Sequence, residues 1–238
     1  MSVRLDISEL VTSFPSYRVA LVVARDLAAE PADAAALDKA VGAAAAEVAA
    51  FVAARPLAEI AELQVWRAAY KAFGVKKTSY RSSVERLLKQ VQQGRGLPRV
   101  NALVDCYNAV SARHRLPVGA DDLAKVEGGL AFRLARPGDA FFALGATPPK
   151  DDPPKPGEVV YADAEKILCR RWNWYQDARS ATSASTHDAV LTVQWLGGGS
   201  DLEPAVAELC DWLGAHCGAR TAWAIAEAAR PLAEVEPS

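Results

Sequence analysis

The order in which hydrophobic patterns occur along the chain most constrains its fold. Apolar residues recur at helical spacing through most of the first half, whereas the second half carries short β-branched runs separated by Gly and Pro. Helices are expected at 28–54 (one or two), 60–73, 82–93, 103–114 and 200–215. Strands are expected at 17–24, 130–134, 140–144, 159–161, 167–169 and 190–193. Helices followed by short strands predict an α+β fold, with helices packed on a mixed or antiparallel sheet.

The composition excludes several classes of protein. Of 238 residues, 51% are hydrophobic and 24% charged, which is enough for a packed core and excludes a disordered chain. No apolar run approaches the ~18 residues of a membrane span, and Arg4, Asp6 and Glu9 interrupt any signal-peptide pattern. Four cysteines do not make a disulfide framework in a chain of this length. We therefore expect a reduced, cytoplasmic protein.

The positive charge is concentrated in one segment, although the net charge is −2 and the pI about 6.0. Nine basic residues lie between Arg67 and Arg99, where Glu85 is the only acid, and aromatic residues are interleaved with them. Clustered cations beside aromatic rings are typical of a surface for a polyanion with stackable bases. An ordinary solvated helical face remains the alternative.

Three local patterns offer polar or cationic groups to a ligand. Asn101, Asp105 and Asn108 share one small polar face of the helix expected at 103–114, which favours either ligand hydroxyl or ammonium binding or a buried network. Residues 80–83 read Tyr-Arg-Ser-Ser at a helix start, where an anion can bind or the serines can simply cap. Residues 170–174 read Arg-Arg-Trp-Asn-Trp, in which one indole is expected in the core and the other available for stacking.

The familiar catalytic and cofactor motifs are absent from the sequence. There is no GxSxG, phosphate loop or dinucleotide fingerprint, so no cofactor is expected and no catalytic residue is identified. Cys210, His216 and Cys217 lie close together but lack a fourth ligand, so no metal site is expected.

Residues 101–145 resemble the B3/B4 tRNA-binding and editing module of the bacterial phenylalanyl-tRNA synthetase beta subunit. One family pattern is Val-Asp-x-x-Asn-Tyr-Val and the next is Gly-x-Pro-Leu-His-Ala-Phe-Asp-Leu-Asp-Lys. The segments here that are similar to this family are 104–110, 116–125, 128–130, 133–139, 158–163 and 185–191. Including 81–85 and 170–174, the similarity to stand-alone members of the family covers roughly residues 70–215.

The resemblance implies the B3/B4 fold for residues 61–238, with residues 1–60 (a strand and Ala-rich helices) integral to it. It also implies tRNA as the partner and trans hydrolysis of mischarged aminoacyl-tRNA at the tRNA 3′ end, without a membrane partner or a defined oligomeric state. The implied substrate-binding residues are Asn101, Asp105, Asn108, Gly119, Arg170, Arg171, Trp172 and Asn173. The implied tRNA-backbone contacts are Lys76, Lys77, Arg81 and Ser82.

Two departures from the family pattern leave the activity open. Gly119 stands where the family has a His associated with its editing pocket, and the Arg-Arg-Trp-Asn-Trp string replaces a Gly-rich strand-turn. The pocket is therefore either rebuilt for another aminoacyl group or no longer catalytic. The alternatives to an aminoacyl-tRNA deacylase are a tRNA- or RNA-binding module without catalysis and a small-molecule-binding protein that reuses the fold.

Overall fold

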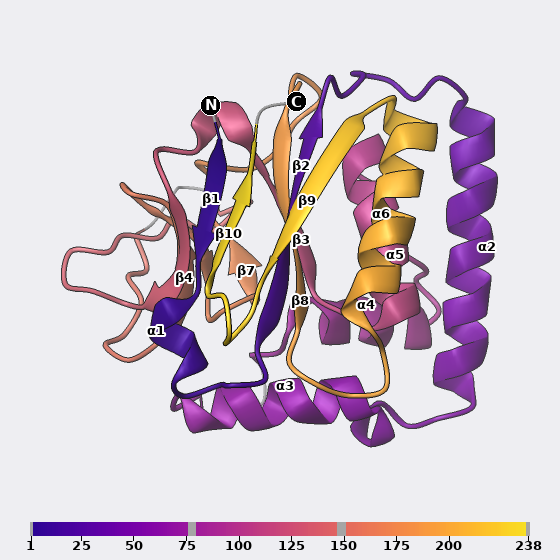
Figure 1. Cartoon of the computed structure of the whole chain (residues 1–238). Coiled ribbons are helices and arrows are strands. Elements are labelled where there is room, and N and C mark those ends of the chain that lie inside the picture. Colours follow the sequence, from indigo (N-terminus) through magenta and orange to yellow (C-terminus); the bar gives the residue numbers. More distant parts are fainter. Residues whose placement is uncertain (1, 76–79, 147–150, 237–238) are drawn as a thin grey trace.

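A computed structural model describes residues 2–75, 80–146 and 151–236 and arranges them in one helical layer and two β-sheets (Figure 1). The four-stranded sheet is antiparallel and has the order β3 (Val118–Asp122), β8 (Ala189–Trp195), β2 (Arg18–Arg25), β9 (Arg220–Ala226). The six-stranded sheet has the order β10 (Leu232–Val235), β1 (Val3–Asp6), β4 (Leu130–Leu134), β5 (Val159–Ala162), β6 (Ile167–Arg170), β7 (Tyr175–Gln176). Its described pairs are antiparallel except β1 with β4, so the sheet is mixed.

Strand β2 shows why the four-stranded sheet lies in the middle of the molecule. Its interior is apolar without alternation, as expected for a strand covered on both faces. Because successive side chains point to opposite faces, Ala20 and Val22 pack among the helices. Val19 and Leu21 pack against the six-stranded sheet instead. The early strand of the chain thus separates the two main cores.

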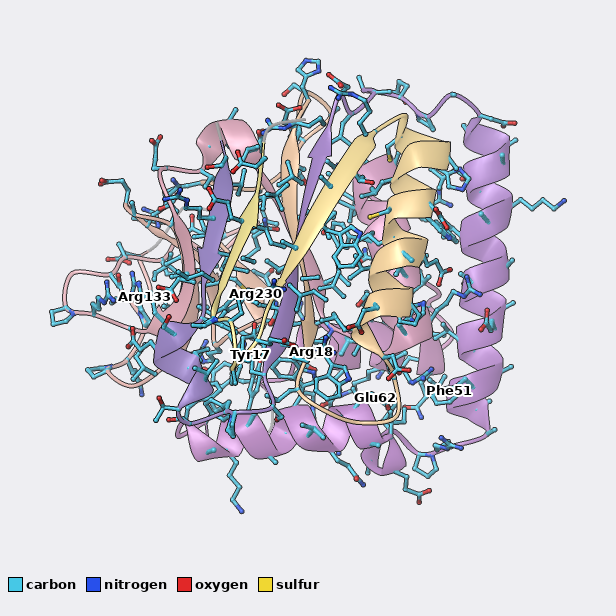
Figure 2. All side chains as sticks on the ribbon, viewed as in Figure 1. Tyr17, Arg18, Phe51, Glu62, Arg133 and Arg230 are labelled. Atoms are coloured by element: carbon cyan, nitrogen blue, oxygen red, sulfur yellow. The ribbon has the colours of Figure 1, made fainter. Side chains whose placement is uncertain are left out.

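The helices on the outer face have the bounds α2 (Ala34–Ala53), α4 (Ser83–Gln92), α5 (Ala102–His114) and α6 (Leu202–Cys217). Helix α3 (Ala61–Ala72) crosses one end of both sheets (Figure 1). Tyr17 lies just before β2 and close to α3, where its ring meets that of Trp66 at 6.5 Å and 82° (Figure 2). The short helices are α1 (Ser8–Val11), η1 (Leu57–Glu59) and η2 (Leu123–Lys125).

The α+β fold expected from the order of patterns is confirmed, and the alanine-rich segment forms the single long helix α2. The helix starts follow from side-chain caps. Asp33 accepts a hydrogen bond from Ala36 N at 2.9 Å, and Asn101 accepts one from Val104 N at 2.9 Å. Ser82 caps α4 by accepting from Glu85 N. Helix α2, which contacts α5, buries one alanine and four larger apolar residues: Leu37, Val41, Ala44, Val48 and Val52.

Two expectations are wrong. Residues 140–144 form no strand, because aspartate side chains take their N–H groups: Asp151 accepts from Phe141 N at 3.0 Å and Asp177 from Phe142 N at 2.8 Å. The helix expected to start at residue 200 starts at Leu202, with Asp201 as its N-cap. The Ser200 hydroxyl instead donates to Glu62 at 2.5 Å, near the α3 end of the molecule (Figure 2).

The sequence analysis also missed several strands, β3 among them. Its sequence, Val-Gly-Ala-Asp-Asp, contains residue types that are depleted in strands. It forms because its backbone pairs with β8, where Gly119 lies opposite Thr192 and Asp121 opposite Val190. This strand places four of its residues, Val118, Gly119, Ala120 and Asp121, on the wall of the cavity described below.

Candidate functional site

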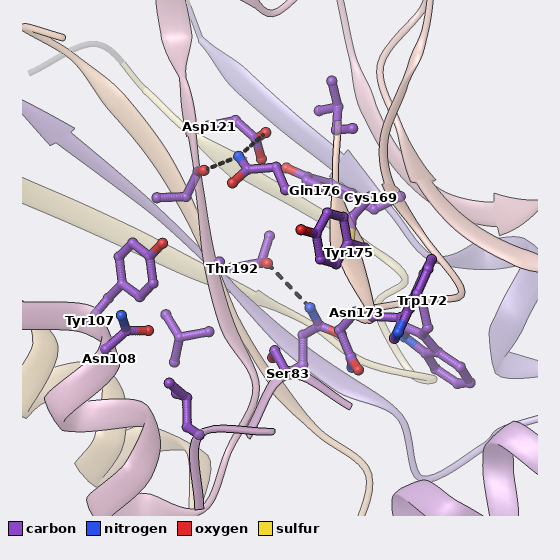
Figure 3. Close-up of a pocket in the computed structure, with 18 residues that line it drawn as sticks. Ser83, Tyr107, Asn108, Asp121, Cys169, Trp172, Asn173, Tyr175, Gln176 and Thr192 are labelled. Carbon is purple, nitrogen blue, oxygen red and sulfur yellow. Dashed lines mark hydrogen bonds between the residues drawn. The ribbon is translucent and has the colours of Figure 1, made fainter. Parts of the chain in front are cut away.

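A cavity of about 170 Å³ lies where α4 and α5 meet the ends of the two sheets (Figure 3). Strands β3 and β8 form one wall, and β5, β6, β7 and the turn before β7 form the opposite one. Its lining residues are Ser83, Leu87, Tyr107, Asn108, Val118, Gly119, Ala120, Asp121, Tyr161, Leu168, Cys169, Trp172, Asn173, Trp174, Tyr175, Gln176, Thr192 and Gln194. An apolar cavity of about 150 Å³ accommodates a benzene molecule, so this one accommodates a group the size of an amino-acid side chain but not a nucleoside.

Part of the polar lining is a closed hydrogen-bond network that fixes the floor of the cavity. Asn173 donates to Gln194 at 3.0 Å and accepts from the hydroxyl of Tyr70 at 3.0 Å. The backbone oxygen of Asn173 accepts from Ser83 N at 3.0 Å, which holds the start of α4 against the cavity. These groups are satisfied and serve to position their neighbours.

Other polar atoms of the lining have no hydrogen-bond partner among the described residues. They are the Ser83 hydroxyl, the Tyr161 hydroxyl and the indole nitrogen of Trp172. Buried polar groups are nearly always paired in native proteins, so an unpaired set around one cavity indicates a place for ligand or water. Asn108 also projects from α5 into this space (Figure 3).

Asp121 is a carboxyl group on the cavity wall. It accepts a hydrogen bond from Ser180 Oγ at 2.6 Å. It also accepts one from Gln176 Nε2 at 3.0 Å (Figure 3). Burial raises the pKa of Asp121 to about 7, against these two hydrogen bonds, and the carboxylates of Asp163 and Asp177 add to the rise. The group therefore changes charge near neutral pH.

Gly119 leaves open space on the same wall. A Cβ atom built on Gly119 would have no heavy atom within 4 Å, and its φ angle does not require glycine. The missing side chain thus enlarges the cavity rather than permitting a special backbone shape.

The turn at residues 171–174 connects the cavity to the protein surface. Arg171 and Trp172 have φ angles of 49° and 65°, a region that costs bulky residues on the order of 1–3 kcal/mol. Packing offsets this cost, because Trp172 is fully buried and meets Trp66 edge-to-face at 5.2 Å. The expectation that one indole lies in the core is thus confirmed for Trp172.

Arg171 lies between two aromatic rings. Its guanidinium stands 3.7 Å from the ring centre of Tyr80 and 4.4 Å from that of Trp174, and one of its terminal nitrogens has no partner among the described residues. Burial lowers the pKa of Arg171, opposed by Glu158, yet the group remains a cation at neutral pH. Arg171 and Tyr80 line a surface pocket of about 360 Å³ that also includes Lys155. Trp174 lines the first cavity and its ring contacts Arg171, so the two sites are neighbours.

Three of the predicted ligand residues lie away from the cavity. Asn101 caps α5, and Asp105 accepts from Val100 N at 2.8 Å and pairs with Arg99 at 2.6 Å. Arg170 is 1% exposed and pairs with Glu158 at 2.7 Å. The polar face expected from Asn101, Asp105 and Asn108 is thus divided. Asn101 is a cap residue, which lies outside the helix and does not follow its periodicity. Asn108, Gly119, Trp172 and Asn173 do line the cavity.

A buried carboxylate pairs with two arginines of the basic segment. The buried Glu85 pairs with Arg67 at 2.8 Å and with Arg81 at 2.5 Å. Ser82 is used as the α4 cap. Lys76 and Lys77 lie outside the described residues. The segment that looks strongly cationic in sequence therefore presents fewer unpaired cations than its composition indicates.

Two further properties are settled for the described part of the chain. It contains no group of three or more His, Cys, Asp or Glu side chains that would hold a metal ion. No described helix combines the length and apolarity needed to cross a membrane.

The residues that sequence reasoning missed are Asp121, Tyr161 and Gln176. A signal was present for Asp121: it stands where the quoted family pattern has Phe, two residues after the His position taken by Gly119. Tyr161 and Gln176 carry no comparable signal, because they reach the cavity only through the pairing of β5, β6 and β7.

The chain is similar to parts of known proteins. The chain is 33% identical over 96 residues to the phenylalanine–tRNA ligase beta subunit of Chromobacterium violaceum, a match that covers 40% of this chain and 12% of that subunit. The crystal structure of an N-terminal fragment of the phenylalanyl-tRNA synthetase beta-subunit from Pyrococcus horikoshii is similar with a TM-score of 0.47 and 11% identity, covering 91% of this chain and 49% of that one. Residues 65–200, which include every lining residue of the cavity, match the model of the B3/4 domain, and the chain belongs to that family.

Proposed function

We propose that this protein binds the aminoacylated 3′ end of tRNA and hydrolyses the aminoacyl ester of mischarged tRNA in trans. The observation that carries the proposal is the cavity itself, which has the volume of one amino-acid side chain, unpaired hydroxyls on its wall and a stacked cation beside it. Its residues fall within the B3/4 match, and the curated relative is a tRNA ligase subunit.

The chemistry requires little from the protein, because an aminoacyl ester is already activated. A positioned water and hydrogen-bond donors for the developing oxyanion are sufficient, and the neighbouring ribose hydroxyl can orient the water. Ser83 supplies a hydroxyl at the positive end of α4, and Tyr161 supplies a second from β5. We assign these two groups as the oxyanion donors.

The stack of Arg171 between Tyr80 and Trp174 is our candidate for the contact with the tRNA end. An aromatic-flanked guanidinium can pair with phosphate and stack with a base. Because Trp174 lines the cavity and its ring contacts Arg171, a tRNA end held at Arg171 would direct its ester toward the cavity.

A deacylation assay on a panel of mischarged tRNAs tests the proposal. We expect release faster than the spontaneous rate for one or a few aminoacyl groups. Ser83→Ala and Tyr161→Phe should each lower kcat by about 10²-fold, the effect of removing one oxyanion donor. The control is Ser13→Ala, because Ser13 is exposed and does not line the cavity; this variant should leave turnover unchanged. No release above background for any pair would refute the hydrolase assignment.

A small-molecule-binding protein remains the second candidate, favoured by one observation. Glu85 neutralises two arginines of the basic segment, which weakens the case for an extended phosphate surface. Ionic strength separates the two candidates, because phosphate contacts release counterions and tRNA affinity then falls steeply with salt. Binding of a small amino-acid ligand would change little.

A further inference from the structure

The charged lining of the cavity is acidic. Asp121 is its only charged lining residue, and none of the described lining residues is Lys, Arg or His. The side chain belongs to a residue that is only 5% exposed. The cavity therefore has an acid without a base of its own.

The hydrogen bonds of Asp121 leave one oxygen available. Ser180 Oγ and Gln176 Nε2 both donate to Oδ1. No described residue donates to Oδ2. A buried carboxylate with half of its acceptor capacity unused is costly, and such groups are normally paired with a cation.

The neighbouring charges do not supply that cation. Asp163 and Asp177 are the charged groups that act on Asp121 most strongly. Each already forms an ion pair, Asp163 with Lys166 at 2.6 Å and Asp177 with Arg179 at 2.8 Å. Their negative field makes a positive ligand more favourable at Asp121.

The other groups around Asp121 also suit a cation. The hydroxyls of Tyr107 and Tyr161 are buried, and after burial the carboxylate of Asp121 is the next cause that raises the pKa of each. The Cys169 thiol behaves in the same way. All three therefore stay neutral at physiological pH. Aromatic rings attract cations through their electron-rich faces, and Trp172, Trp174 and Tyr175 add further aromatic rings to the lining of the cavity.

We propose that Asp121 is the counter-ion for an ammonium group of the ligand, so that the cavity selects amine-bearing aminoacyl groups over N-blocked or amine-free analogues. The inference deepens the proposed function, since it takes the ligand to be an aminoacyl group. The ammonium can come from the α-amino group that every aminoacyl ester carries or from a basic side chain.

Binding of amino-acid amides to the full chain tests the inference without tRNA and without turnover. The probes are a panel of L-amino-acid amides, their Nα-acetyl derivatives, and Nα-acetyl-lysinamide, which keeps only a side-chain amine. Isothermal calorimetry measures Kd, and the fluorescence of Trp172 and Trp174 at the cavity gives a second readout. Loss of affinity on Nα-acetylation assigns the α-ammonium, whereas tight binding of Nα-acetyl-lysinamide assigns a side-chain amine.

The decisive variant is Asp121→Asn, whose Oδ1 can still accept both hydrogen bonds. We expect its Kd for the tightest amine-bearing amide to rise about 30-fold or more, the loss typical of one partner of a buried charge pair. Asp122→Asn is the matched control, because Asp122 is equally buried but accepts from Thr186 outside the cavity; its Kd should stay within about twofold. Amine binding by the wild type should also release about half a proton near pH 7, which Asp121→Asn abolishes.

Equal affinity of wild type and Asp121→Asn would overturn the inference, as would equal affinity for Nα-acetylated neutral amides. Failure of every amine-bearing amide to bind below about 10 mM would overturn it too. Amine binding that depends on Asp121 in a protein without deacylase activity would uphold the inference and remove the proposed function.

Discussion

Replacing Asp121 by Asn should change how the stability of the protein depends on pH. In the folded state, burial raises the pKa of Asp121 from 3.8 to about 7. The folded protein therefore keeps this proton between about pH 4 and about pH 7, where the unfolded chain has lost it, and the stability that Asp121 contributes falls as pH rises through this window. About three pKa units at 1.36 kcal/mol each amount to about 4 kcal/mol.

The Asn side chain is neutral at every pH and does not pay this cost of charging. Asp121→Asn should therefore gain stability relative to the wild type by up to about 4 kcal/mol between about pH 4 and about pH 8. The titrating groups that face Asp121 are Asp163, Asp177, Tyr107, Tyr161 and Cys169. They are present in both proteins, so their contributions largely cancel in the difference.

Urea unfolding of both proteins at about pH 4.5, 6 and 8 measures the difference, with m-values checked for equality. Asp122→Asn is the matched control. A stability difference that stays constant with pH within about 0.5 kcal/mol would refute the reasoning, because it would show that the carboxyl is not held at a raised pKa.

Three further outcomes are expected. Glu158→Gln should destabilise the fold by about 3 kcal/mol in urea unfolding, since it leaves the buried Arg170 guanidinium to pair with the exposed carboxylate of Asp152; a loss below about 1 kcal/mol would contradict this. Gly119→Ala should keep or raise stability by about 0.4–1 kcal/mol, because the new methyl group meets no atom within 4 Å, yet weaken amide binding in calorimetry by narrowing the cavity. Arg171→Lys should weaken tRNA binding in a filter assay while amide affinity stays constant, because lysine cannot keep the stacked, planar contact; parallel losses would remove Arg171 from the tRNA contact.

The candidate site was only partly predictable from the sequence. Asn108, Gly119, Trp172 and Asn173 were expected from motifs and do line the cavity. Arg170 was expected to contact the ligand, but the sequence pattern around it could not reveal that Glu158 pairs with it inside the protein. A sequence shows which side chains are charged and leaves open which charges cancel after folding.

Local patterning determined the helices, the strands with β-branched runs and the α+β class, because helix caps and hydrophobic periodicity act within a few residues. Strand β3 and the loop at 140–144 were decided by tertiary contacts instead. Pairing with β8 stabilises β3, although its residue types are depleted in strands. Asp151 and Asp177 accept hydrogen bonds from backbone N–H groups of residues 140–144, whose sequence favours a strand. The same holds for Asp121. Its neighbours Gln176 and Ser180 lie 55 and 59 residues away along the chain, and only the folded sheets bring them together around a buried carboxyl.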